Sequence, residues 1–161
     1  MLDLEDKANA FAKVRAPDSS GDALVIPRWG KGEWTTLFSY TTEMKLPSGA
    51  TLIRQAMPDQ TLYFLVSGVL EAAVSYGEQA LAPLRVIYPG SVVGEVAFFD
   101  GGPRSARVWA VEDSELLGLG PADYGRFAAA HLHLANELLL GLGRLVAFRL
   151  RHVTVRATSL R

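Results

Sequence analysis

Several common sequence features are missing from this chain of 161 residues. It has no cysteine, which excludes a disulfide framework, a thiolate metal site and a cysteine nucleophile. Neither charge is in excess, since 16 Lys and Arg stand against 17 Asp and Glu, so the composition gives no electrostatic case for a nucleic-acid binder. No apolar run is long enough to span a membrane, and the first seven residues include three acidic ones, Asp3, Glu5 and Asp6, where a signal peptide needs a basic start. These absences predict a cytoplasmic protein without a membrane span.

Histidine is missing from residues 1–130, and the three that occur are His131, His133 and His152. A barrel metalloenzyme of the cupin type needs imidazoles that project from strands into the barrel. A serine nucleophile likewise needs a nearby base. We therefore expect no metal, no cofactor and no catalytic residue. A cupin-like enzyme is the alternative that bound metal in the purified protein would favour.

The chain divides into a helical start, a strand-rich middle and a helical end. Leu4, Ala8, Phe11 and Ala12 have the spacing of a short amphipathic helix. Short apolar or alternating runs separated by turn residues then fill about 44–120, at 51–54, 62–66, 69–74, 84–87, 106–111 and 115–119. Many short strands at this spacing predict a barrel or jelly roll. Helical spacing returns after Pro121, first around Tyr124 and then from about 132 to 155.

The stretch 90–108 interrupts the strand pattern with a helix-compatible piece, Glu95 to Phe99, which Gly94 opens. The first amides of a helix have no intrahelical partner, and they lie at the positive end of the helix dipole. The amides of Val96 and Ala97 are therefore able to hold an anionic phosphate. Gly94 lets a ligand approach the backbone closely.

Three side chains extend this candidate site. Arg104, expected to begin the next strand, offers a fixed fork of donors to phosphate oxygens. Glu95 is repelled by a phosphate unless it meets a donor, and a ribose hydroxyl is such a donor. Ser105 adds a hydroxyl. The alternative is a structural clip, in which Glu95 and Arg104 only form an ion pair with each other across the turn.

Gly94-Glu-Val-Ala97 followed by Pro103-Arg-Ser-Ala106 resembles the phosphate-binding cassette of the cyclic-nucleotide-binding domain family, the fold of the catabolite activator protein and of kinase regulatory subunits. Residues 59–68 and the glycines at 49 and 90 extend the resemblance. It implies a mainly β fold with flanking helices (α+β), an eight-stranded antiparallel jelly-roll β-barrel. The implied parts are an N-terminal helix and loop at 1–32, the binding barrel at 33–131 with the cassette at 90–108, and a C-terminal helix and tail at 132–161.

The resemblance also implies a ligand, cyclic AMP or cyclic GMP, with its phosphate on Arg104 and its ribose 2′-hydroxyl on Glu95. The implied ligand-binding residues are Gly94, Glu95, Val96, Ala97, Arg104, Ser105 and Ala106. Ser105 does not settle which base is preferred. A C-terminal helix that starts near Leu132 is expected to close over the base and relay binding. The alternative function is a ligand-free domain that serves only as a protein-interaction module.

The C-terminal segment suggests how the signal leaves the domain. Leu132, Leu139, Val146 and Val153 repeat every seven residues, with Ala135 and Leu142 between them, a seam that predicts a homodimer. Arg149 falls on the continuation of this seam, and burial within the monomer is the alternative. Few residues follow Val155, so no helix-turn-helix and no DNA binding are expected. The expected partners are a cyclic nucleotide, a second copy and an unidentified effector protein.

Overall fold

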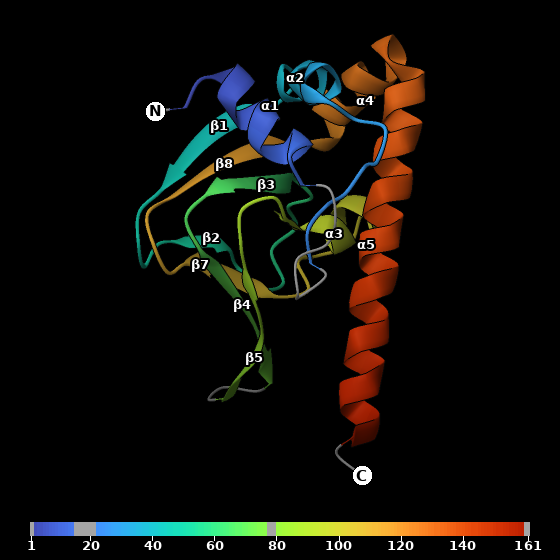
Figure 1. Ribbon diagram of the computed structural model, residues 1–161. Helices are drawn as coiled ribbons and strands as arrows, with labels where there is room; N and C mark the ends of the chain where they lie inside the picture. The colour runs from blue at the N-terminus through green and yellow to red at the C-terminus, as the bar shows by residue number, and fades with distance from the viewer. Residues whose placement is uncertain (1, 15–21, 77–79, 160–161) are drawn as a thin grey trace.

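Two four-stranded antiparallel sheets form the middle of the chain in this computed structural model, which describes residues 2–14, 22–76 and 80–159 (Figure 1). The first sheet has the order β1 (Thr42–Leu46), β8 (Ser114–Leu119), β3 (Leu62–Ser67) and β6 (Val92–Val93). The second has the order β2 (Thr51–Ile53), β7 (Arg107–Ala110), β4 (Leu70–Tyr76) and β5 (Ala80–Ile87). Each of the six expected runs forms a strand, and the predicted eight-stranded jelly roll with helices at both ends is confirmed.

Strand β3 separates two apolar cores. Leu62, Phe64 and Val66 face a core beneath the helices. Tyr63 and Leu65 face a second core between the two sheets. Because both faces of β3 are covered, its sequence is a continuous apolar run rather than an alternating one. The second core forms the floor of the cavity described below.

Aromatic rings fill the core on the helical side. The N-terminal helix α1 (Leu4–Ala12), as expected, brings Phe11 against Trp34 and Phe38 of helix α2 (Lys31–Phe38), with ring centroids 4.9 and 5.3 Å apart. Helix α2 was not expected from the sequence. Its eight residues are too few for a clear helical period, and the Glu33 carboxylate caps it by accepting from the Gly30 amide at 2.8 Å.

Helices α4 (Pro121–Ala130) and α5 (Leu132–Ser159) follow the last strand where the sequence predicts them. Helix α5 runs along the side of the barrel and continues past it (Figure 1). Ala135 and Leu142 are fully buried in the helical core, so they are unavailable for the expected seam between two copies. At Gly141 the helix passes close to the segment that carries Ile26, since a Cβ at Gly141 would lie 2.9 Å from the Ile26 side chain. Within the described ranges, none of the helices combines the length and apolarity needed to cross a membrane.

Candidate functional site

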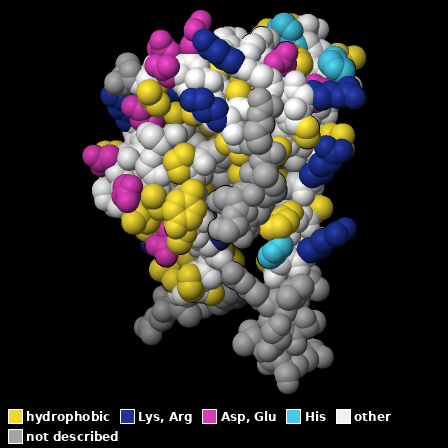
Figure 2. Space-filling view, in the orientation of Figure 1, with side chains coloured by type: hydrophobic (Ala, Val, Ile, Leu, Met, Phe, Trp, Pro, Cys, Tyr) yellow, Lys and Arg dark blue, Asp and Glu magenta, His cyan; other side chains and the backbone are white. Residues whose placement is uncertain are grey.

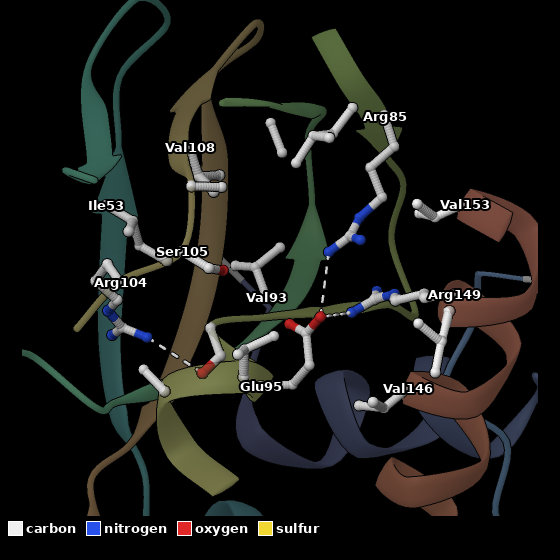
Figure 3. Close-up of a pocket in the computed structure, with 17 residues that line it drawn as sticks. Ile53, Arg85, Val93, Glu95, Arg104, Ser105, Val108, Val146, Arg149 and Val153 are labelled. Atoms are coloured by element: carbon white, nitrogen blue, oxygen red, sulfur yellow. Dashed lines mark hydrogen bonds and ion pairs between the residues drawn. The ribbon is translucent and has the colours of Figure 1, made fainter. Parts of the chain in front are cut away.

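A cavity of about 260 Å³ lies between the second sheet, helix α3 (Glu95–Asp100) and helix α5 (Figure 3). All seven binding residues predicted from the sequence line it. Most of the remaining wall is apolar, formed by Ile53, Ala72, Leu84, Val93, Val108, Val146, Leu150 and Val153. Polar groups therefore meet in a largely apolar pocket, the usual form of a small-molecule site.

The turn into α3 requires glycine. Gly94 has φ 86°, in the left-handed region that side chains disfavour. A Cβ at this position would also collide with the Arg104 guanidinium and lie 2.6 Å from the Thr61 carbonyl oxygen. Past this turn Ala97 is buried and Val96 is 40% exposed. The glycine thus brings the start of α3 into contact with the guanidinium.

Arg104 precedes its strand instead of opening it as predicted, because β7 begins at Arg107. The loop that carries Arg104 is nevertheless fixed by its backbone. The Arg104 amide donates to the Met57 carbonyl at 2.9 Å, and its carbonyl accepts from the Ala56 amide at 2.8 Å. These two backbone hydrogen bonds to residues 56 and 57 thus take the place of the hydrogen bonds that a strand would make at Arg104.

The Arg104 side chain is buried and held from three sides. Its Nη2 donates to the Asp59 carboxylate and, at 2.7 Å, to the Thr61 carbonyl, while Nη1 donates to the Gly94 carbonyl at 3.2 Å. Burial alone would raise the pKa of Asp59, but hydrogen bonds from Arg104 and Thr61 outweigh it and lower that pKa. The buried Nε has no hydrogen-bond partner among the described residues. Such an unpaired donor beside a cavity calls for an acceptor.

Glu95 lies on the cavity floor and is only 6% exposed. Its Oε1 lies 2.6 Å from Arg149 Nη1 and 3.5 Å from Arg85 Nη2. Burial raises the pKa of Glu95, but the charges of Arg149 and Arg85 outweigh burial and lower it. The clip alternative is wrong as stated, because Arg104 pairs with Asp59 and Glu95 pairs with two other arginines.

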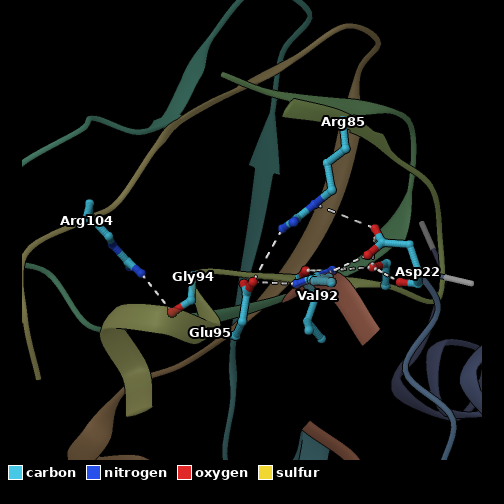
Figure 4. Close-up of polar contacts among 8 residues, drawn as sticks. Asp22, Arg85, Val92, Gly94, Glu95 and Arg104 are labelled. Carbon is cyan, nitrogen blue, oxygen red and sulfur yellow. Dashed lines mark hydrogen bonds and ion pairs between the residues drawn. The ribbon is translucent and has the colours of Figure 1, made fainter. Parts of the chain in front are cut away.

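Asp22 extends this ion-pair network behind Glu95 (Figure 4). Arg149 Nε donates to Asp22 at 2.6 Å, and Arg149 Nη2 donates to the Val92 carbonyl at 2.9 Å and to Ser91 Oγ at 3.1 Å. Arg85 Nε lies 3.7 Å from Asp22. Burial and the Arg149 charge lower the pKa of Arg85. For Arg149 burial acts downward, but its carboxylate partners prevail and raise the pKa.

The cavity thus has two charged walls. The cassette wall consists of Gly94 and Arg104 together with Asp59 and Thr61, which bind the guanidinium from outside the cavity lining, and the helix wall consists of Arg85 and Arg149 together with their partner Asp22. Glu95 lies between them (Figure 3).

Four charged residues of the site were missed by the sequence analysis: Asp22, Asp59, Arg85 and Arg149. Arg149 was assigned to the seam continuation, but the structure turns it inward to Asp22 and Glu95. A charge in an apolar strand or helix face is the feature that could have singled out Arg85 and Arg149, since such groups are buried only with partners. Nothing local could have identified Asp22, because its partner Arg149 is 127 positions away.

The remaining predicted residues are more accessible to solvent. Ser105 is exposed, Ala106 is half-buried, and both line the cavity. Helix α5 starts at Leu132 as expected, and the part of it that lines the cavity is Val146 to Val153. The first turns of α5 are committed elsewhere, because Ala135 and Leu138 pack in the helical core.

The jelly roll thus holds a largely apolar cavity with a buried guanidinium, Arg104, on one side and a buried carboxylate, Glu95, between it and two further arginines. The sequence model of the cyclic nucleotide-binding domain matches residues 43–131, more than half of the chain. The chain therefore belongs to the cyclic nucleotide-binding domain family.

Two relatives agree with this membership, and a solved structure shares the fold. The cyclic AMP receptor protein of Thermus thermophilus is 34% identical over 70% of this chain and 50% of its own length. A cAMP-dependent protein kinase regulatory subunit of Aspergillus fumigatus is 32% identical over 52% of this chain and 19% of its own length. The chain thus spans half or less of these relatives. A cyclic nucleotide-binding domain from Methylobacillus flagellatus has the same fold, with a TM-score of 0.83, 18% identity, and coverage of 98% of this chain and 86% of that one.

Proposed function

We propose that the chain is a sensor that binds a 3′,5′-cyclic nucleotide in this cavity without chemical turnover. The cyclic phosphate meets Arg104, the Val96 and Ala97 amides and the Ser105 hydroxyl. The ribose 2′-hydroxyl donates to Glu95. The unpaired, buried Nε of Arg104 beside the cavity carries this proposal, because a phosphate oxygen supplies the acceptor that the described residues do not.

Gly94 and Ala106 fit this arrangement by their small size. Both line the cavity, and neither carries a side chain that would fill it. The barrel at 33–131 is the binding unit in this proposal, and 132–161 is the responding unit.

Helix α5 relays binding through its middle rather than its start. Val146, Leu150 and Val153 line the cavity, and Arg149 holds Glu95. A ligand that draws Glu95 into a hydrogen bond with its ribose changes how strongly Arg149 is held. If the ligand prefers one position of α5, it shifts the population toward that position. The signal then passes to an effector protein along the outer face of this helix.

Two copies pair along the exposed face of α5. The half-exposed or exposed residues on that face follow alternating four- and three-residue steps, which is heptad spacing: Leu132, Asn136, Leu139, Gly143, Val146, Leu150 and Val153. The molecular edge that α5 forms carries basic side chains with hydrophobic ones among them (Figure 2). Because Val146 and Val153 also line the cavity, ligand binding and pairing involve the same side chains.

Calorimetric titration with cyclic AMP and cyclic GMP tests the binding proposal. Arg104→Ala should weaken binding by about 2–5 kcal/mol, since it removes a buried charge partner of the phosphate. Arg107→Ala is the matched control, because Arg107 is exposed, lies outside the cavity and bonds Thr51 Oγ1 at 3.3 Å. It should bind like the parent. No heat with either nucleotide would favour the ligand-free interaction module.

Sedimentation equilibrium tests the pairing. Leu139→Glu should convert a dimer to a monomer, because it places a charge in the middle of the seam. Leu140→Glu, the same change at an exposed position about a quarter-turn away, should leave the dimer intact. A parent chain that sediments as a monomer would contradict the pairing.

A further inference from the structure

A second cavity, of about 440 Å³, lies between the first half of α5 and the turn at residues 26–28. It shares no lining residue with the nucleotide cavity described above. We call this second cavity the helix groove. It is therefore a separate surface, which the proposed binding site does not use.

The segment 22–29, here called the strap, is attached to α5 at both of its ends. At one end Asp22 accepts from Arg149 Nε at 2.6 Å, and at the other end Trp29 Nε1 donates to Glu137 at 2.8 Å. The strap therefore runs antiparallel to α5. Because Glu137 lines the helix groove and Asp22 belongs to the helix wall, the strap connects the groove to the nucleotide cavity.

A β-turn places Arg28 beside the helix groove. The Trp29 amide donates to the Ile26 carbonyl at 2.9 Å, which closes a turn over these four residues. Pro27 occupies the second position of the turn, which proline favours because its φ is already fixed there. Arg28 follows at the tip of the turn, where it is exposed and lines the groove. Local structure thus directs a cation toward α5.

The helix groove carries an excess of positive charge. Arg28 of the strap and Arg144 of α5 both line it and are exposed, and neither guanidinium has an ion pair or hydrogen bond with a described residue. The one carboxylate in the described lining, Glu137, is already bonded to Trp29 and lies 3.5 Å from His133. Two cations of the groove are thus left to pair with an outside partner.

The groove also exposes apolar surface next to these cations. Leu140 is 56% exposed, and Pro27 is exposed as well. The edge that α5 forms shows the same mixture of basic, histidine and hydrophobic side chains (Figure 2). A protein segment with carboxylates on both sides of an apolar side chain would pair with the arginines and cover Leu140. A second copy fits less well, because a two-fold pair brings the same patch of each copy together, and the unpaired arginines of both would meet.

We infer that the helix groove is the docking site of the effector protein, which enters it with an acidic segment that carries an apolar side chain between its carboxylates. The strap couples this groove to the nucleotide cavity, and the coupling rests on the proposed function. When the ribose hydroxyl occupies Glu95, the hold of Arg149 on Asp22 changes, so the strap and its turn move relative to α5. The nucleotide and the acidic segment then change each other's affinity by the same factor.

Selection from a phage-displayed library of random short peptides on the parent chain tests the docking. Enriched sequences should carry Asp or Glu on both sides of an apolar residue. A synthetic copy of an enriched peptide, followed by fluorescence anisotropy, should bind Arg28→Glu and Arg144→Glu roughly ten-fold more weakly than the parent, because each change turns an attraction into a repulsion. Selection on the variant with both changes should enrich basic peptides instead.

Two controls locate the peptide on the molecule. Arg151→Glu makes the same charge reversal at an exposed position of α5, about two turns beyond Arg144 and outside the groove lining, and it should bind the peptide like the parent. In NMR spectra the peptide should shift the indole N–H resonance of Trp29, whose acceptor lines the groove, and leave that of Trp109 in place. Trp29→Phe identifies the first resonance.

Three results would overturn the docking inference. One is enrichment of neutral or basic peptides by the parent chain. Another is equal affinity of the peptide for the parent and for both charge-reversal variants. The third is conversion of a dimer to a monomer by Arg144→Glu in sedimentation equilibrium, which would assign the groove to a second copy.

The coupling has its own readout. Saturating cyclic AMP or cyclic GMP should change the affinity of the peptide by about five-fold or more, and Asp22→Asn should reduce this change because it weakens the attachment of the strap to Arg149. Nucleotide binding that leaves the affinity of the peptide unchanged would overturn the coupling and leave the docking site standing. Absence of heat with both nucleotides would overturn the proposed function, whereas peptide binding through the two arginines would still support the groove.

Discussion

The two walls of the cavity hold their arginines by different means. On the cassette wall, Arg104 donates to the backbone carbonyls of Thr61 and Gly94 as well as to Asp59. On the helix wall, Arg149 donates to one backbone carbonyl, that of Val92, but its shortest contacts are the 2.6 Å ion pairs with Asp22 and Glu95, which come from other parts of the chain. The Thr61 and Gly94 carbonyls belong to the backbone beside β3 and at the start of α3, so the fold itself fixes their positions. The ion pairs of Arg149 join distant segments, and such a pair is broken when one of its side chains binds a ligand instead. We therefore expect the cassette wall to be preformed, and we propose that the helix wall is the part that a ligand rearranges.

The largest effect should come from removing Arg149, the more closely paired of the two cations of the helix wall. Arg149→Leu leaves Asp22 and Glu95 without their closest cation, and breaking a buried ion pair from one side costs about 3–5 kcal/mol. Urea unfolding measures this as a fall in the free energy of unfolding. Arg144→Leu, on an exposed position of the same helix, should change it by less than about 0.5 kcal/mol. An equal fall in the free energy of unfolding in the two variants would mean that the ion pairs of Arg149 do not stabilise the fold.

A methyl group at Gly94 should disturb the cassette wall next most strongly. Gly94→Ala combines left-handed backbone strain with a clash against Arg104 and Thr61, for a loss of about 2–3 kcal/mol. Gly101→Ala provides the control, because Gly101 also has positive φ, 69°, but has open space around its Cβ position. Its loss should stay near the strain alone, about 1 kcal/mol. If the two variants unfold at the same urea concentration, the close approach of Arg104 is not what demands glycine.

The same contrast explains what could be predicted from the sequence. The cassette wall is encoded within a short stretch, so Gly94, Glu95 and Arg104 were identified together. The strands were predictable because turn residues separate their apolar runs. Helix α2 was not, since its eight residues are too few to show a clear helical period.

The helix wall could not be predicted, because its charges come from segments that only the fold brings together. Asp22 and Arg149 lie 127 positions apart. The direction of Arg149 also depends on how α5 docks. Once Ala135 and Leu142 are buried in the core, Arg149 lies on the inward side of α5 rather than in the seam.

The smallest of these effects should be the pH dependence of the group between the walls. Glu95→Gln keeps the shape and an acceptor but removes the charge that faces Arg149 and Arg85, so at neutral pH it should cost about 1–2 kcal/mol of unfolding free energy. Because the folded state lowers the pKa of Glu95, the stabilisation is complete above the unfolded pKa of about 4.3 and is lost as the pH falls through the lower folded value. Urea unfolding of the parent and of Glu95→Gln at several pH values should therefore give curves that converge only below about pH 4.3. Glu112→Gln, at an exposed carboxyl, should show no such gap at any pH. A gap that widened as the pH fell would mean that burial outweighs the two arginines, and Glu95 would then enter the cavity as a neutral acid with a proton of its own to donate to the ligand.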